Sequence, residues 1–235
     1  MALEAMPRGE DKRALVRAMF DRIAPRYDRM NRLISVGLDQ SWRRRALDII
    51  GVGVGDRLVD LACGTGDFAE LARSRGATVL GVDFAGEMLR GARRRGIDAL
   101  FVQADGGAYP LRDGFASALT CGFALRNFVS LPEIFSEASR VLEPGGRLAF
   151  LEVDRPSNAL LSAGHSFYFD RIIPVLGSFL SDRAAYSYLP KSTVYLPPAR
   201  ELLALITAAG FEQVTKCNLF FGAVQLISAV RRKAN

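Results

Sequence analysis

The sequence predicts an α/β protein in which a Rossmann-like, doubly wound sheet of seven strands lies between layers of helices. Short apolar runs alternate with helix-like segments from residue 57 onward, as expected for strands joined by crossover helices. The runs are almost continuously apolar, which is typical of parallel strands covered on both faces. The first run leads into a tight Gly-Thr-Gly turn at 64–66, and a helical pattern follows it. We therefore expect a single domain over residues 1–235.

The N-terminal segment is expected to be helical. Apolar residues recur there at helical spacing, namely Leu15, Met19 and Ile23. Pro25 is predicted to interrupt this first helix, because proline lacks an N–H and clashes with the preceding turn. A second helix is expected over 41–50, and the glycine-rich stretch 51–56 is expected to be a plain turn before the first strand. Residues 1–50 are expected to form a helical lid.

The remaining elements follow in a regular order. Strands are expected at 57–62, 77–83, 98–105, 115–124, 145–153, 212–219 and 223–230. Helices are expected at 67–75, 85–95, 130–142 and 198–211. Ser130 and Glu133 have the spacing of a capping box, with Pro132 in the first turn. The last two strands are close enough in the chain to pair as a hairpin.

The glycine turn indicates a nucleotide ligand. Gly64-x-Gly66-x-x-Ala69 matches the dinucleotide fingerprint G-x-G-x-x-G/A after a strand. Asp83 ends the next strand, where an acidic residue binds ribose hydroxyls. Because dinucleotides and S-adenosylmethionine (SAM) both bind to such a turn, this pattern alone leaves the two ligands open.

The acidic residues around the turn favour SAM. Asp60 lies at the strand-to-turn junction, where a carboxylate would repel a pyrophosphate and attract the ammonium group of a methionine moiety. Thr65 and Asp67 make the turn polar and acidic, which suits two phosphates poorly. Asp105 ends the third strand and can accept a hydrogen bond from an adenine amino group. Asp60, Asp83 and Asp105 each resemble an ordinary surface acid or cap, but together they fall at the strand edge where open α/β sheets bind ligands.

The composition argues against a nucleic-acid-binding, metal-binding, membrane-spanning or secreted protein. The net charge of +6 comes from scattered arginines without a long basic block, so no nucleic-acid partner is expected. Three distant cysteines and one histidine, His165, offer no zinc-ligand spacing, so no metal site is expected. No stretch approaches the roughly 18–20 apolar residues that span a bilayer, and the charged N-terminus lacks the core of a signal peptide. A cytoplasmic protein is expected.

Several segments resemble the successive motifs of class I SAM-dependent methyltransferases: "VDLACGTGD", "GVDFAGEML", "QADGGAYPL" and "RVLEPGGRL". More narrowly, "FDRIAPRYDRMNRLISVGLDQSWRR" and "GFALRNF" resemble the ubiquinone/menaquinone biosynthesis C-methyltransferases. The likeness covers residues 16–230. It implies methyl transfer from SAM to a ring carbon of a polyprenylated quinol, with demethylmenaquinol to menaquinol as the expected reaction.

The resemblance also implies which residues bind SAM: Thr65, Asp83, Asp105, Gly106 and Gly122. Gly64 and Gly66 would supply backbone for a close approach, and Asp60 is added on electrostatic grounds.

Two residues are candidates for catalysis. Arg126 stays protonated, so it could hold a quinolate oxygen or polarise a water, although a structural ion pair with an aspartate is the alternative. Tyr27 could close the pocket and form a hydrogen bond with the quinol ring, although packing of the N-terminal lid is the alternative.

The acceptor is the part of the expected function for which this sequence departs from the family pattern. The aromatic insertion at 157–197 is expected to cover a lipophilic substrate, and the protein is expected to touch the membrane peripherally. However, Lys191 and Val194 stand where the family usually has an acid and an arginine, and "QLISAVRR" replaces its usual "ALHRGYK". A methyltransferase of another aromatic or polyketide-like compound, and a non-catalytic SAM-binding or RNA-associated protein, remain alternatives. A homodimer is also left open.

Overall fold

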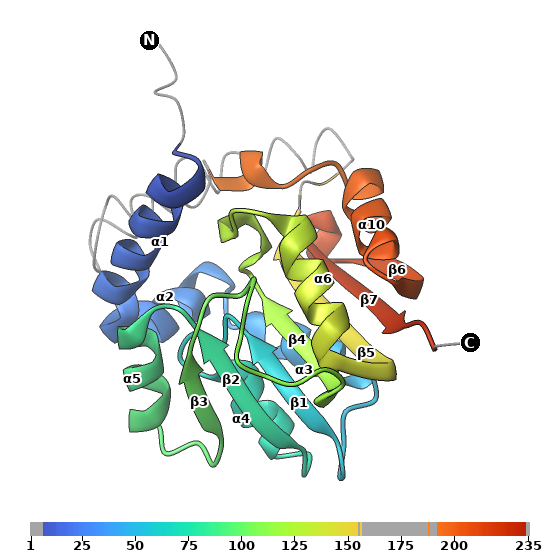
Figure 1. The fold of residues 1–235 in the computed structure, drawn as a ribbon. Helices are drawn as coiled ribbons and strands as arrows, with labels where there is room; N and C mark the ends of the chain where they lie inside the picture. Colours follow the sequence, from blue (N-terminus) through green and yellow to red (C-terminus); the bar gives the residue numbers. More distant parts are fainter. Residues whose placement is uncertain (1–6, 155, 157–187, 189–191, 234–235) are drawn as a thin grey trace.

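A single mixed sheet forms the centre of the molecule. The computed structural model describes residues 7–154, 156, 188 and 192–233, and Figure 1 shows the sheet with helices on both faces. The strands run in the order β3-β2-β1-β4-β5-β7-β6. Their bounds are β1 Arg57–Leu61, β2 Thr78–Asp83, β3 Leu100–Gln103, β4 Ala116–Gly122, β5 Leu142–Val153, β6 Phe211–Leu219 and β7 Val224–Arg231. The predicted seven-stranded doubly wound class is confirmed.

The strand directions determine where a ligand can bind. β1 pairs in parallel with β2 and β4, and β4 pairs in parallel with β5. The chain runs outward from β1 to β3 on one side and from β4 on the other, so the winding direction reverses between β1 and β4. Open α/β sheets bind ligands beyond the carboxyl ends of the strands at this point. The last two strands form the predicted antiparallel hairpin.

Helices cover both faces of the sheet (Figure 1). On one face, α6 (Leu131–Val141) and α10 (Ala199–Ala208) pack against side chains such as Val59 and Phe150. On the other face, α3 (Asp39–Ile49) and α4 (Asp67–Arg73) pack against Leu58 and its neighbours. Adjacent residues of β1 therefore enter opposite cores, which explains why the strand is apolar throughout. Ser130 caps α6 as predicted, accepting a hydrogen bond from the N–H of Glu133.

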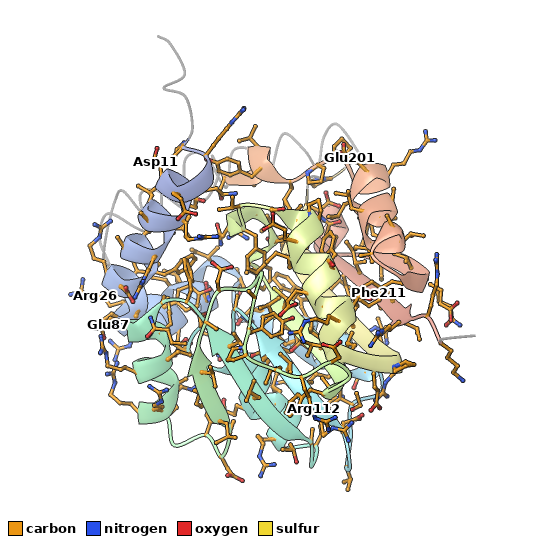
Figure 2. All side chains as sticks on the ribbon, in the orientation of Figure 1. Asp11, Arg26, Glu87, Arg112, Glu201 and Phe211 are labelled. Carbon is orange, nitrogen blue, oxygen red and sulfur yellow. The ribbon has the colours of Figure 1, made fainter. Side chains whose placement is uncertain are left out.

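The N-terminal helices lie across the carboxyl edge of the sheet. α1 (Gly9–Ile23) leads through the 3₁₀ turn η1 (Ala24–Arg26) into α2 (Tyr27–Ile34) and then α3. In Figure 2, the labelled Asp11 marks α1 at this edge, and Arg112, in the loop before β4, lies toward the opposite edge. α1 and η1 pack on α5 (Gly86–Arg94) through an apolar cluster that includes Met19 and Met88.

Sequence analysis did not anticipate α2. Its sequence is strongly polar and only Met30 is buried, so the sequence lacks the apolar stripe that would predict a helix here. Pro25 occupies the start of η1, where its missing N–H costs nothing, and the chain resumes a helix at once. Most of the predicted insertion at 157–197, including His165, lies outside the described residues.

No helix in the described ranges is long and apolar enough to cross a membrane.

Candidate functional site

The Gly64–Gly66 turn follows β1 and requires glycine for two reasons. Both residues adopt left-handed backbone, with φ of +56° for Gly64 and +90° for Gly66. A Cβ on Gly66 would also lie 2.7 Å from Ile97 Cδ1. The turn thus needs residues without side chains, and it directs the start of α4 toward the carboxyl edge of the sheet.

Two pockets open beside this turn. The larger, called here the strand-end pocket, has a volume of about 840 Å³ including its open mouth. Its lining includes several of the predicted site residues: Tyr27, Gly64, Asp83, Asp105, Gly106 and Gly122. The smaller, called here the junction pocket, has a volume of about 300 Å³ and is lined by Asp60, Thr65, Arg43 and their neighbours. Tyr27, Ala62, Gly64 and Gly122 line both pockets, so the two are adjacent.

Asp83 and Asp105 lie in the strand-end pocket at the ends of neighbouring strands. Asp83 is buried, and its two oxygens accept hydrogen bonds from the N–H groups of Gly64 (2.8 Å) and Ala85 (2.9 Å). Burial raises the pKa of Asp83 to about 6. Asp105 Oδ1 accepts from the Gly107 N–H at 2.8 Å, and Oδ2 lies 3.1 Å from Arg13 Nε of α1. Each oxygen retains lone-pair capacity for a ligand.

Gly106 and Gly122 line the same pocket as bare backbone. A Cβ on Gly106 would lie 2.7 Å from Phe128 Cε1, and one on Gly122 would lie 2.9 Å from Phe68 Cε2. Neither position accommodates a side chain without displacing an aromatic ring. The pocket surface is therefore backbone at both points, which favours close approach by a ligand.

Asp60 lies in the junction pocket with an unsatisfied oxygen. It is only 1% exposed, and its Oδ1 accepts a hydrogen bond from Thr120 Oγ1 at 2.9 Å. Its Oδ2 is buried without a hydrogen-bond partner. Burial raises the pKa of Asp60 to about 7. A buried oxygen left unpaired is costly, so this atom is well suited to receive a donor from a ligand.

Arg43 of α3 provides a cation in the same pocket. Its guanidinium contacts Asp39 Oδ2 at 2.7 Å and Asp67 Oδ2 at 3.6 Å, and lies 5.4 Å from the centre of the Phe123 ring. The junction pocket is therefore lined by two acids, Asp60 and Asp67, and one cation, Arg43. Because arginines already pair with Asp67, Asp60 and Arg43 are the groups that suit the amino and carboxylate groups of an amino acid. Arg43 is not identifiable as a site residue from the sequence. "SWRRRAL" contains three adjacent arginines, and their positions along the helix do not show which of them faces a ligand.

The side chains of Thr65 and Asp67, in and after the glycine turn, contact α2. The Thr65 hydroxyl donates to Asp28 Oδ1 of α2. Asp67 receives Arg32 in a two-pronged contact (3.0 and 3.1 Å) and Arg95 at 2.9 Å. Although burial opposes it, the hydrogen bond from Arg32 helps to lower the pKa of Asp67 to about 2. The carboxylate of Asp67 is thus neutralised by arginines, so its charge does not carry the argument against a pyrophosphate; Asp60 does.

Tyr27 of α2 reaches over the glycine turn. A Cβ on Gly64 would meet Tyr27 Cε1 at 3.7 Å, and the Tyr27 ring packs edge-on against Phe20 of α1. Burial raises the pKa of the Tyr27 phenol. The hydroxyl therefore stays protonated at neutral pH and can donate a hydrogen bond.

Arg126 lies in the 3₁₀ turn η2 (Leu125–Asn127) after β4. Its guanidinium forms a buried ion pair with Glu152, which is fully buried in β5, and also donates to Ser192 Oγ and the Phe123 carbonyl. The ion-pair alternative is thus present in the structure, with a glutamate as the partner. Arg126 is not among the residues that line the strand-end pocket, whereas its neighbours Ala124 and Asn127 are.

Comparisons with known proteins identify the family of this chain. The model of the ubiE/COQ5 methyltransferase family matches residues 6–231. A demethylmenaquinone methyltransferase of Thermus thermophilus is 44% identical over 200 residues, covering 82% of this chain and 91% of that protein. One of a Roseiflexus species is 39% identical over 237 residues, covering 99% and 100%. A ubiquinone/menaquinone biosynthesis C-methyltransferase of Geobacter sulfurreducens is 38% identical, covering 92% and 88%.

Solved structures share the fold at low identity. A Haemonchus contortus phosphoethanolamine N-methyltransferase in complex with SAM superposes with a TM-score of 0.62 and 14% identity, covering 82% of this chain and 53% of that one. A SAM-dependent methyltransferase of Aquifex aeolicus superposes with a TM-score of 0.61 and 14% identity, covering 86% and 97%. These likenesses support the class I architecture. From the family match and the identities together, this chain belongs to the ubiE/COQ5 methyltransferase family, whose members are SAM-dependent methyltransferases.

Proposed function

We propose that this enzyme methylates a ring carbon of a polyprenylated quinol, converting demethylmenaquinol to menaquinol with SAM as the donor. The relatives named demethylmenaquinone methyltransferase support this acceptor, since one of them aligns over nearly the whole chain. The structural observation that carries the donor assignment is the unpartnered Oδ2 of Asp60 beside the glycine turn. SAM supplies an activated methyl group on a sulfonium, a good leaving group.

The residues present fit SAM across the two adjacent pockets. In the strand-end pocket, Asp83 accepts the ribose hydroxyls and Asp105 the adenine amino group. In the junction pocket, Asp60 accepts the ammonium group and Arg43 donates to the carboxylate of the methionine end. Gly64, Gly66, Gly106 and Gly122 present backbone, and Thr65 ties the turn to the lid.

The acceptor is placed where Tyr27 and the 124–128 segment meet the strand-end pocket. Tyr27 donates a hydrogen bond to a ring oxygen, because its phenol stays protonated. Arg126 is assigned a part in activating the quinol. Since Glu152 balances its charge, its contribution comes from a directed N–H or from positioning Asn127, rather than from net positive charge.

The proposal includes three features of the whole protein. The N-terminal helices act as a lid, residues 157–197 cover the acceptor within a single domain, and the cytoplasmic enzyme contacts the membrane peripherally to meet its lipophilic substrate.

The test is production of S-adenosylhomocysteine by the purified enzyme. We expect turnover with demethylmenaquinol and none with RNA. Turnover with a different aromatic or polyketide-like phenol, but not with the quinol, would replace the proposed acceptor. That alternative is supported by Val194, which is 66% exposed where the family usually has an arginine.

A second experiment tests Arg126 without leaving a buried charge unpaired. Replacing Arg126 alone would strand Glu152, at a cost of about 3–5 kcal/mol. The double variant Arg126→Gln/Glu152→Gln removes both charges and keeps hydrogen-bonding groups. We expect it to bind SAM normally and to lose about 100-fold or more in kcat. The control is the double variant Arg57→Gln/Glu143→Gln, which removes an ion pair that lines neither pocket and should keep a near-normal kcat. A double variant with near-normal kcat would end the catalytic assignment of Arg126.

A further inference from the structure

Two adjacent phenylalanines are exposed at the end of β6. Phe221 is 75% exposed and Phe220 is 48% exposed. Both belong to the 3₁₀ turn η5 (Phe220–Gly222), and both have left-handed backbone, with φ of +45° for Phe220 and +56° for Phe221. Left-handed backbone is unfavourable for any residue that carries a Cβ. Retaining aromatic side chains in water at two strained positions points to a functional surface.

The position of this turn follows from the sheet. β6 is antiparallel to β7, and β7 is antiparallel to β5. β6 therefore runs parallel to β5 and β4, and its last residue, Leu219, lies at the carboxyl edge. The exposed phenylalanines are thus at the same edge of the sheet as the glycine turn and the two pockets.

A chain of aromatic rings joins this turn to the strand-end pocket. The Phe221 and Phe220 ring centres are 5.8 Å apart, and Phe220 is 5.9 Å from Trp42 of α3. Trp42 is in turn 6.3 Å from Phe123, which lines the strand-end pocket. The series Phe221–Phe220–Trp42–Phe123, called here the aromatic path, runs without a break from the surface to the pocket.

Two exposed arginines follow Trp42 on α3, while the acid beside the turn, Asp154, is paired with Lys216. The two arginines are Arg44 and Arg45, and Arg45 is three residues from Trp42, on the same side of the helix. The chain as a whole carries a net charge of +6. Aromatic side chains flanked by arginines match an anionic bilayer, because rings insert at the headgroup level while guanidinium groups remain beside the phosphates.

We propose that Phe220 and Phe221 dock the enzyme on an anionic phospholipid bilayer, and that the aromatic path leads the apolar acceptor from the bilayer to the pocket. The inference rests on the proposed quinol acceptor and adds the surface by which the enzyme reaches it. Docking at the carboxyl edge places the mouth of the pocket against the membrane, so the acceptor would not have to cross water.

The binding experiment uses vesicles of phosphatidylcholine, alone or mixed with phosphatidylglycerol in equal parts. Trp42 is the only tryptophan of the chain, so its emission reports directly on the path. We expect wild-type enzyme to sediment with the mixed vesicles, with a shift of Trp42 emission to shorter wavelength, and to be released by salt.

Matched variants separate docking from general apolar exposure. Phe221→Ser should reduce partitioning onto mixed vesicles by about tenfold or more, given the size of the ring removed from the bilayer. Val54→Ser is the control, because Val54 is 89% exposed but precedes β1 at the opposite edge, and it should bind like wild type. Equal partitioning of wild type and Phe221→Ser would overturn the proposal. So would a loss of self-association in Phe221→Ser, seen by light scattering, with vesicle binding unchanged, since the turn would then join two copies.

Turnover distinguishes this inference from the proposed function. With demethylmenaquinol in mixed vesicles, Phe221→Ser should raise KM by about tenfold, while its kcat/KM with a short-tailed, water-soluble naphthoquinol should equal that of wild type. Loss of turnover with both acceptors would mean that Phe221 is structural and would overturn docking. Absence of turnover by wild type with either acceptor would instead defeat the proposed function, and vesicle binding would still decide the docking surface.

Discussion

Asp60 shows how one buried carboxyl group can serve a ligand at a cost to the empty fold. Its neighbours provide one hydrogen bond, from Thr120, and leave Oδ2 unpaired. Burial therefore holds its pKa at about 7. Near neutral pH the group is close to half ionised, and the ammonium of SAM would select the ionised form.

We expect SAM affinity to depend on pH through this group. If only the ionised Asp60 binds, lowering the pH from about 7 to about 6 should weaken binding roughly fivefold. Asp60→Asn should bind SAM more weakly at neutral pH and lose this dependence. Isothermal titration calorimetry over this interval measures both effects, and wild-type affinity that is flat with pH would contradict the assignment. Asp83, with a pKa of about 6, would add at most about a twofold change over this interval, and Asp60→Asn measures that smaller contribution separately.

The same variant should make the empty protein more stable. Because the folded-state pKa of Asp60 lies above its unfolded value, the group stabilises the fold below about pH 4 and loses this contribution as pH rises through about 7. A neutral amide in its place would carry no such penalty, so at pH 8 we expect Asp60→Asn to raise the Tm by several degrees. At about pH 4 the gain should vanish. Thermal unfolding at the two pH values measures the difference, and equal shifts at both would count against the buried-charge explanation.

At the scale of elements, Asp67 joins the lid to the glycine turn. It stands at the start of α4 and binds Arg32 from α2 and Arg95 after α5, with Arg43 of α3 nearby. The Asp67 side chain is buried, so these ion pairs differ from pairs between two exposed side chains at the surface. They help to hold α2, which buries only Met30, beside the pockets, and they add to the packing of α3 on the sheet.

Removing this carboxylate should loosen the lid. Asp67→Asn removes one carboxylate from Arg32 and Arg95, but Arg32 keeps Asp39 and Arg95 keeps Glu70. We therefore expect a loss of about 1–3 kcal/mol in the free energy of unfolding. Hydrogen exchange should speed up most in α2 and α3. Asp113→Asn is the control, since Asp113 pairs with Arg140 but is 79% exposed, and should cost less than about 1 kcal/mol. Uniform exchange in the Asp67 variant would argue against a role in holding the lid.

At the scale of the whole molecule, the N-terminal helices, the glycine turn and three strand ends meet at two adjacent pockets. A ligand that fills both pockets should therefore stabilise the entire fold. At about 100 times its Kd, SAM should add about 2.7 kcal/mol, which corresponds to roughly 5–10 °C in Tm for a chain of this size. NAD should give no shift, because Asp60 disfavours a pyrophosphate. Scanning fluorimetry with each compound makes the comparison, and a shift with NAD alone would refute the nucleotide assignment.

Much of this fold could be predicted because each strand is encoded by a short apolar run within the local sequence. Val59, Leu80 and Phe150 belong to apolar runs that need no distant partner to be recognised, and their parallel arrangement follows from burial on both faces. The positive φ of Gly64 and Gly66 was likewise implied by glycine itself. α2 was missed because its stability comes from ion pairs such as Arg32–Asp67, between residues 35 positions apart, and not from a local apolar stripe.

By itself, the sequence determined the sheet, the glycine turn and the acidic strand ends, since residue type and spacing specify backbone conformation and charge locally. Only the tertiary structure decided which groups face one another. It brought Arg43 beside Asp60, gave Arg126 a buried partner in Glu152, and set Phe221 in line with Trp42 and the pocket. The physical reason is that charge compensation, burial and ring contact arise between residues distant in the chain, and packing alone determines those neighbours.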